Sequence, residues 1–334
     1  MAFTRYHDAM TSARRVVLVF VDGLGLGDPS SPDNPCRDPR LRILANFRPS
    51  GWAPPPDGGR PDALPGVVRD RPLPHGGAVW ATDASLGVSG LPQSATGQTT
   101  LFTGVNAALV LNRHLYGYPT RTLQRILLQH SILKRLTEAG KRAVFANAFR
   151  PLFFALGEEI WKRPMSASSW ANRAAGLPFR SVEDLLAGRA VYQDITHDSA
   201  RDRGVDIPLR EPETAGAILA SVAALHHFTL FEFFQTDKAG HAMDRGKAEH
   251  ELWKLERFLA AVLDGLDLDR TVLLVTSDHG NIEDLSVKTH THNPVPTLAF
   301  GPGAEGLASR LDRLEGFTPA ILQTLGVQTD PDVG

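Results

Sequence analysis

Acidic and imidazole side chains directly follow two short apolar runs of this chain. Val16–Val21 precedes Asp22-Gly23, and Val272–Val275 precedes Ser277-Asp278-His279-Gly280. A short, nearly continuous apolar run is typical of a strand that is buried on both faces in a parallel sheet. The glycine that follows each acid permits a sharp turn. Carboxylate and imidazole groups bind metal ions such as Zn²⁺ and Mn²⁺, so these strand ends are candidates for a metal site.

A third acid follows another apolar run. Phe228–Phe234 leads to Asp237, and His241 lies one helical turn further on, so that both side chains point the same way. Asp-x-x-x-His alone also fits a capping acid and a surface histidine. Three acids at one edge of a sheet repel one another unless cations bind them, and the whole set therefore favours two divalent ions. The polar loop after Asp278 adds His290, His292 and Asn293 as further possible ligands or partners.

Ser94 begins a segment that predicts a helix, and Gly104 ends it. A serine at a helix N-terminus lies among free backbone amides and at the positive end of the helix dipole, which suits a phosphate group. A hydroxyl group that coordinates a cation has a lowered pKa and becomes a nucleophile. For this segment alone, a helix-capping serine is the simpler interpretation.

The elements that must position these residues alternate between strand and helix. Besides the strands above, we expect strands at 78–82, 143–146 and 297–300, and helices at 94–104, 122–129, 131–139, 212–226 and 247–266. A last helix is expected to have Thr318 as its N-cap and Pro319 at its first position. This alternation predicts a three-layer α/β/α sandwich with a mostly parallel, doubly wound sheet. In such folds, ligands bind beyond the carboxyl ends of the strands.

The composition indicates a globular protein of one large domain with an insertion. The chain has 334 residues, of which 42% are hydrophobic and 22% charged. We expect residues 1–147 and 212–334 to form the metal-binding catalytic domain and residues 148–211 to form a small inserted cap. Residues 29–74 are rich in Pro, Gly and Arg and have no assigned role.

Charge and hydropathy exclude several classes of partner. The net charge is −2 and there is no basic block, so nucleic acid is not expected as a partner. Val16–Val21 is too short to span a membrane and lacks the pattern of a signal peptide, so we expect a soluble cytoplasmic protein. The single cysteine, Cys36, leaves no intrachain disulfide framework and no cysteine metal cluster.

Six motifs occur in the order of a known family. They are Val19-Phe20-Val21-Asp22-Gly23, Ser94 ahead of Gly104, Asp237-x-x-x-His241, Ser277-Asp278-His279-Gly280-Asn281, His290-Thr291-x-Asn293-Pro294-x-Pro296 and Thr318-Pro319-x-Ile321-Leu322-x-x-Leu325-Gly326. With these motifs the chain resembles the alkaline phosphatase superfamily, and within it most closely cofactor-independent phosphoglycerate mutase and phosphopentomutase. The motifs cover the two flanks of the chain, whereas residues from about 106 to 211 show no such resemblance.

The resemblance implies a phosphoryl-transfer enzyme with two divalent ions, Mn²⁺ or Zn²⁺. One ion is then held by Asp237, His241 and His290. The other is held by Asp22, Asp278, His279 and the oxygen of Ser94. Ser94 is then the nucleophile, which attacks the phosphorus atom of a small phosphorylated metabolite in line and forms a phosphoserine. His290 fits the motif better than His292, because the following Thr and the spacing to Asn293-Pro294 match.

The chain also departs from that family. Gln98 stands where the two mutases carry a histidine, and their large cap is replaced by a shorter insertion. The motif that matures into a formylglycine in sulfatases is absent, which disfavours cleavage of sulfate esters. Side chains that could face a phosphate or carboxylate of the substrate are Arg113, His114, Arg121, Asn147 and Arg150. Solvated surface charge is the alternative for each of the charged ones.

Several functions remain open at this point. A mutase and a phosphatase differ only in whether a hydroxyl group or water takes the phosphoryl group from the serine. A phosphodiesterase or headgroup-transferase is a second possibility, supported by the aromatic residues between Phe149 and Phe179. A non-catalytic metal-binding module with the same fold is a third, although the ligand set is complete. The sequence specifies neither the physiological substrate nor the oligomeric state.

Overall fold

The computed structural model describes residues 15–44, 48–50, 64, 66–68 and 72–328. A six-stranded sheet has the order β4-β8-β7-β1-β6-β5, and β2 and β3 form a separate antiparallel pair. The strands are β1 (Arg15–Val21), β2 (Arg48–Ser50), β3 (Gly66–Val68), β4 (Ala78–Thr82), β5 (Ala143–Phe145), β6 (Phe228–Phe233), β7 (Thr271–Thr276) and β8 (Val295–Phe300). Within the excursion at 29–74, residues 45–47, 51–63, 65 and 69–71 lie outside the described residues.

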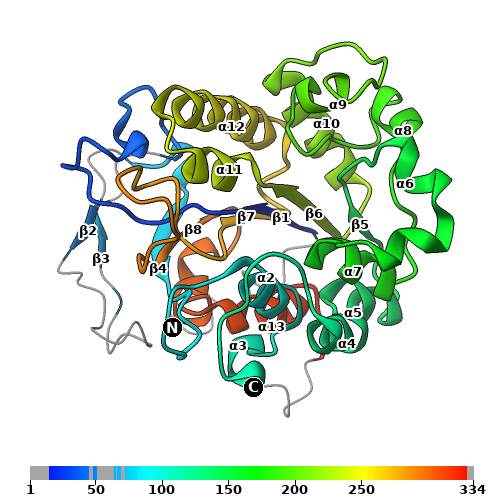
Figure 1. The fold of residues 1–334 in the computed structure, drawn as a ribbon, viewed down its shortest axis with the longest axis horizontal. Helices are drawn as coiled ribbons and strands as arrows, with labels where there is room; N and C mark the ends of the chain where they lie inside the picture. The colour runs from blue at the N-terminus through cyan, green and yellow to red at the C-terminus, as the bar shows by residue number, and fades with distance from the viewer. Residues whose placement is uncertain (1–14, 45–47, 51–63, 65, 69–71, 329–334) are drawn as a thin grey trace.

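Helices cover both faces of the sheet (Figure 1). One layer contains α10 (Pro212–Ala224), α11 (Gln235–Ala242) and α12 (Arg245–Gly265). The other contains α2 (Ser94–Thr103), α3 (Ala107–Leu111), α4 (Arg121–His130), α5 (Ile132–Glu138), α7 (Ala167–Ala174) and α13 (Phe317–Thr324). At the β5 edge lie α6 (Pro151–Ala155), α8 (Val182–Leu186) and α9 (Asp198–Arg201). Short 3₁₀ segments occupy Pro35–Arg37, Pro74–Gly76, Gly157–Lys162, Ala304–Arg310 and Leu314–Gly316.

The sheet is mostly parallel. β1 is parallel to both of its neighbours, β6 and β7, and β5 is parallel to β6. β8 is antiparallel to β7 and to β4, so β8 runs against the other strands of this sheet. The prediction of a three-layer α/β/α sandwich with a mostly parallel sheet is therefore confirmed.

The alternating side chains of β1 build the core on both faces of the sheet. Val17, Val19 and Val21 belong to the apolar cluster that includes buried residues of α10 and α12. The residues between them, represented by Leu18 and Phe20, belong to the cluster that includes buried residues of α2, α5 and α13. Full burial of one such side chain contributes about 1.5–3 kcal/mol to folding, so the central strand is firmly held from both sides.

The segment predicted as a cap contains α6, α7, α8 and α9. In α7, Trp170 and its neighbours Ala167 and Ala171 belong to the same apolar cluster as Phe20. Further along, Leu185 and Tyr192 belong to a smaller cluster of their own. One part of residues 148–211 thus extends the main core and another part packs on itself. The division of the chain into catalytic domain and cap stays a prediction.

Two further expectations can be compared with the structure. The last helix begins at Phe317 with Gly316 at its N-cap, so the predicted cap at Thr318 is wrong. Thr318 instead donates a hydrogen bond from Oγ1 to the carbonyl oxygen of Leu101 at 3.0 Å, and this bond ties α13 to α2.

Within the described part of the chain, no helix combines the length and the apolar character needed to cross a membrane.

Candidate active site

The carboxyl ends of β1, β6 and β7 meet at one edge of the sheet, because these three strands are neighbours and parallel. Asp22 comes directly after β1, and Asp278 and His279 lie in the turn after β7. Asp237 lies in the first turn of α11, which follows β6 almost at once. The fold thus brings together the three acids that the sequence places near strand ends.

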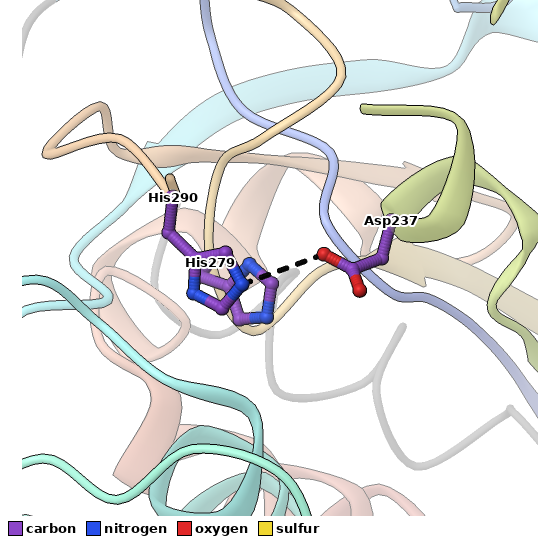
Figure 2. A group of neighbouring side chains, drawn as sticks. All are labelled: Asp237, His279 and His290. Carbon is purple, nitrogen blue, oxygen red and sulfur yellow. Dashed lines mark ion pairs between the residues drawn. The ribbon is translucent and has the colours of Figure 1, made fainter. Parts of the chain in front are cut away.

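Asp237 lies between two histidines. Its Oδ1 atom is 3.4 Å from Nε2 of His241, one turn along α11, and 3.5 Å from Nε2 of His290. Those two Nε2 atoms are 3.3 Å apart. Figure 2 shows Asp237 facing His290, whose ring stacks on that of His279 with centroids 3.6 Å apart. Asn281 donates a hydrogen bond from Nδ2 to the same carboxylate oxygen of Asp237 at 2.7 Å.

Backbone carbonyls orient both of these imidazoles. Nδ1 of His241 lies 2.8 Å from the carbonyl oxygen of Lys288, and Nδ1 of His290 lies 2.8 Å from that of Pro92. Since a carbonyl oxygen only accepts, each Nδ1 carries the hydrogen, and each Nε2 turns towards Asp237. A proton or a metal cation must therefore lie among Asp237 Oδ1 and the two Nε2 atoms. This arrangement of a ring nitrogen held by a carbonyl is the one found in histidines that ligate metals.

His279 connects Ser94 to the other two acids. Its Nε2 atom lies 3.0 Å from Oγ of Ser94, 3.2 Å from Oδ1 of Asp22 and 3.6 Å from Oδ2 of Asp278. Gln98, on α2, donates a hydrogen bond to Oδ2 of Asp22 at 3.1 Å. Gln98 stands where the resembled mutases have a histidine, and it acts here as a donor to a candidate metal ligand.

Burial and the neighbouring charges shift the pKa values of Asp22, Asp278 and His279. Burial, together with the neighbouring Asp278 carboxylate, raises the pKa of Asp22 to about 7. Burial also raises the pKa of Asp278 to about 6. For His279, burial alone disfavours the charged ring, but the carboxylates of Asp278 and Asp22 outweigh it and raise the pKa to about 10. Without a metal, His279 therefore retains its proton at neutral pH, and Asp22 retains its proton in part.

The chemistry of the donor set fits divalent cations. Ligand atoms of Asp22, Asp278 and His279 lie within 4.8 Å of one another, and so do ligand atoms of Asp237, His279 and His290. Asp278 is fully buried, and neither of its carboxylate oxygens accepts a hydrogen bond from the described residues. A buried carboxylate without such donors is costly, and a cation among these atoms removes that cost.

Ser94 is the first residue of α2, and its side chain does not cap the helix. Gln93 occupies the N-cap position without a side-chain cap bond. The expectation of free amides around Ser94 is wrong for the next two residues, because the amides of Ala95 and Thr96 both point at the carbonyl oxygen of Leu115, at 3.1 and 3.4 Å. The bond to His279 therefore gives Ser94 a role that the capping interpretation does not explain.

A cavity of about 730 Å³ opens beside these groups, and Asp22, Ser94 and Asp237 line it. Of the residues predicted to contact the substrate, Asn147 and Arg150 line this cavity. Arg113, His114 and Arg121 are not among its lining residues: both arginines are exposed, and Nε2 of His114 lies 3.0 Å from the carbonyl oxygen of Val88.

The cavity has further polar walls that the sequence interpretation missed. They are formed by Tyr118, Tyr192, Gln193, Arg203, Glu232 and Lys238. Glu232 carried a usable signal, because it is an acid inside the apolar run Phe228–Phe234. Lys238 lies within the motif Asp237-x-x-x-His241 and could have been noticed there. Tyr118, Tyr192, Gln193 and Arg203 lie in segments without a regular pattern, and no feature of the sequence distinguishes them from surface residues.

A buried carboxylate, Glu283, joins the loops around the metal ligands. It is 1% exposed and accepts hydrogen bonds from the amides of Gly25 and Asn281 at 2.9 and 2.7 Å. Its other oxygen accepts from Oγ1 of Thr291 at 2.5 Å and from Nδ2 of Asn293 at 3.1 Å. Glu283 therefore holds the turn after β1, the turn after β7 and the loop that carries His290.

Comparison with known proteins finds a metalloenzyme match in the C-terminal part of the chain. The family model described as the metalloenzyme superfamily matches residues 210–329. The 2,3-bisphosphoglycerate-independent phosphoglycerate mutase of Paracoccus denitrificans is 27% identical over 129 residues, which are 36% of this chain and 25% of that enzyme. This chain thus matches about a quarter of the length of that curated relative.

Solved structures resemble the chain over almost its whole length. The PH0037 protein from Pyrococcus horikoshii has a TM-score of 0.53 and 15% identity, covering 95% of this chain and 98% of its own. Alkaline phosphatase from the Antarctic bacterium TAB5 has a TM-score of 0.46 and 12% identity, covering 96% of this chain and 99% of its own. The first likeness supports the fold.

Proposed function

We propose that this chain is a metal-dependent phosphoryl-transfer enzyme that acts on a phosphomonoester. The match of residues 210–329 to the metalloenzyme superfamily model supports this proposal. The observation that carries the proposal is the position of Ser94. Its Oγ atom lies 3.0 Å from Nε2 of His279, and the residue lines a cavity of about 730 Å³. Nucleophile, candidate ligands and substrate space thus meet at one edge of the sheet.

In this proposal the described side chains hold two divalent ions, Mn²⁺ or Zn²⁺. Asp237, His241 and His290 hold one, and Asp22, Asp278, His279 and Oγ of Ser94 hold the other. When bound, the ions neutralise the buried carboxylates, lower the pKa of the Ser94 hydroxyl and stabilise the charge on the entering and leaving oxygens.

The side chains of the protein then perform the transfer. Ser94 Oγ forms a bond to phosphorus while the bond from phosphorus to the ester oxygen breaks, which leaves a phosphoserine and a free alcohol. The proton that Ser94 loses balances the one that the departing alcohol gains. A second acceptor then takes the phosphoryl group from Ser94: water in a phosphatase, or a hydroxyl group in a mutase. Both remain within the proposal.

A phosphodiesterase or headgroup-transferase is the second candidate. The observation that favours it is the aromatic part of the cavity wall, which includes Tyr118, Phe145, Phe149 and Phe234. Such a wall suits a substrate with an apolar or planar group attached to the phosphate. A panel that contains both phosphomonoesters and phosphodiesters distinguishes the two candidates.

The test is the substitution Ser94→Ala. We expect turnover of every accepted ester to fall by roughly 1,000-fold or more, because the nucleophile is lost. Mass spectrometry of the wild type, quenched during turnover, should find phosphate on the peptide that contains Ser94. Ser221→Ala is the matched control, since Ser221 is exposed and its hydroxyl donates only to the backbone of its own helix. Undiminished turnover in Ser94→Ala, without a phosphopeptide in the wild type, contradicts the mechanism.

A further inference from the structure

The cavity wall carries a carboxyl group that the proposed reaction does not use. Glu232 lies on β6, lines the same cavity as Ser94 and is 5% exposed. A glutamate is almost never this deeply buried unless a partner compensates for it. The groups that contact Glu232 therefore indicate what its carboxyl group can still bind.

Two neighbouring elements hold Glu232 in place. Asn147, just after β5, donates from Nδ2 to the carbonyl oxygen of Glu232 at 2.8 Å and accepts from its amide at 2.9 Å. Ser168, on α7, donates from Oγ to Oε2 of the carboxyl group at 2.5 Å. The backbone and one carboxyl oxygen are thus fixed before any ligand arrives, as in a preorganised binding site.

The other carboxyl oxygen, Oε1, has no such partner. Among the hydrogen bonds of the described residues, the bond from Ser168 to Oε2 is the one made to this carboxyl group. A carboxylate oxygen accepts up to two hydrogen bonds. On a cavity wall, this oxygen is available to a donor group of a bound molecule.

Other charges of the cavity decide which donor fits. Arg150, Arg203 and Lys238 also line the cavity, together with the acids Asp22, Asp237 and Glu232. Once metal ions neutralise Asp22 and Asp237, the three cationic side chains disfavour a further cation such as an ammonium group. The same three side chains suit the negative charge of a phosphoryl substrate. A neutral hydroxyl group is then the donor that satisfies Glu232 without adding positive charge to this wall.

We propose that Glu232 is a specificity-determining residue that accepts a hydrogen bond from a hydroxyl group on the carbon chain of the substrate. The substrate class is therefore phosphate esters of hydroxylated chains, such as polyols or sugars, in preference to simple alkyl phosphates. This assignment rests on the proposed phosphoryl transfer for the nature of the ester. A hydrogen bond to this carboxyl group corresponds to about a 10-fold preference.

Phosphonates test this subsite without any turnover, because their carbon–phosphorus bond is not cleaved by transfer to a serine. Calorimetric titration of the Mn²⁺-loaded protein compares propyl, hydroxypropyl and aminopropyl phosphonate, together with the corresponding butyl series. We expect the best hydroxyl compound to bind about 10-fold or more tightly than its alkyl counterpart, and the amino compounds to show no such gain. Equal affinities, a preference for the amino compounds, or no binding by any of them overturns the proposal.

Variants of Glu232 and of its partner complete the test. Glu232→Ala should remove the preference, whereas Glu232→Gln should keep part of it, because an amide oxygen still accepts. Ser168→Ala removes the bond that fixes Oε2, so the preference should weaken without being lost. Glu305→Ala is the matched control, because Glu305 is exposed, and it should keep the preference in full. An unchanged preference in folded Glu232→Ala, with folding checked by thermal unfolding, overturns the proposal. If Ser94 carries no phosphate but the preference is present, the proposed reaction fails while the hydroxyl subsite stands.

Discussion

Glu283 determines the geometry of the metal ligands without being one of them. It is buried and accepts hydrogen bonds from three separate parts of the chain, represented by Gly25, Asn281 and Thr291. Asn281 in turn donates to the carboxylate of Asp237. Partners of this kind, which orient ligands from behind, affect metal affinity nearly as much as the ligands do.

The substitution Glu283→Gln tests this role. A glutamine keeps the shape but replaces one accepting oxygen by an NH₂ group, so donors that now bind the carboxylate face another donor. We expect Mn²⁺ affinity to fall about 10- to 100-fold, as measured by calorimetric titration of the chelator-treated protein. Glu305→Gln is the control, because Glu305 is exposed. Wild-type affinity in Glu283→Gln contradicts the positioning role.

At the residue scale, the sequence predicts those site residues that directly follow a strand. Asp22, Asp278 and His279 come together because they follow parallel neighbouring strands. The apolar runs of the sequence predict these strands. Arg113 and Arg121 show the opposite case, since the charge of a residue does not by itself reveal which way the side chain faces. Glu283 and Glu232 have partners far along the chain, represented by Gly25 and Ser168, and no local sequence pattern predicts such contacts.

At the scale of elements, the close approach of α2 to the turn after β7 brings nucleophile and ligands together. Gly97 faces Asp278: a Cβ atom at this position lies 2.9 Å from Cβ and 3.0 Å from the carbonyl oxygen of Asp278. A larger residue must therefore push α2 away from the turn. The same helix carries Ser94 at its start, so its distance from His279 depends on this contact.

Gly97→Ala should accordingly impair the site and the fold together. We expect about 1–3 kcal/mol of lost stability in urea unfolding and at least about a 10-fold loss of turnover. The control is Gly246→Ala in the first turn of α12, where an added Cβ meets only the side chain of Asp244 at 3.5 Å. That change should be neutral or slightly stabilising, because alanine is the better helix former. Unimpaired turnover in Gly97→Ala shows that the approach is not needed.

The regular elements were predictable and the irregular ones were not. α12 and the strands β1 and β7 have strong periodic or continuous apolar patterns, and the structure contains them. The helices α6, α8 and α9 are each five residues or shorter and lie in a segment without periodicity. The start of α13 was misjudged, because Thr318 satisfies its hydroxyl on another helix instead of its own N-terminus.

At the scale of the whole molecule, the buried acids make stability depend on pH and on metal. The pKa values of Asp22 and Asp278 in the folded protein, about 7 and about 6, lie above the ordinary value of 3.8. The folded metal-free protein thus binds more protons than the unfolded chain, and the associated stability is lost as pH rises from about 4 to about 7. The raised pKa of His279, about 10, extends this loss to higher pH.

Metal should therefore stabilise the protein more at higher pH, because it replaces protons that the site otherwise retains. We expect the difference in Tm between Mn²⁺-loaded and chelator-treated protein to be clearly larger at about pH 8 than at about pH 6. Asp278→Asn removes one of the buried charges and should reduce this pH dependence. A Tm difference that is the same at both pH values contradicts the assignment of the buried acids as metal ligands.

The central position of β1 also bears on how this chain is synthesised. Its two hydrogen-bonded neighbours are β6 and β7, so a ribosome must add roughly 250 residues, from Val21 to Thr271, before both exist. At ordinary translation rates this takes about 10–50 s. Until β6 is made, this apolar strand has no partner on either edge, and until β7 follows it has a partner on one edge only, a state that favours aggregation. The middle of the finished sheet, and with it the edge where the metal ligands meet, is among the last parts that can form.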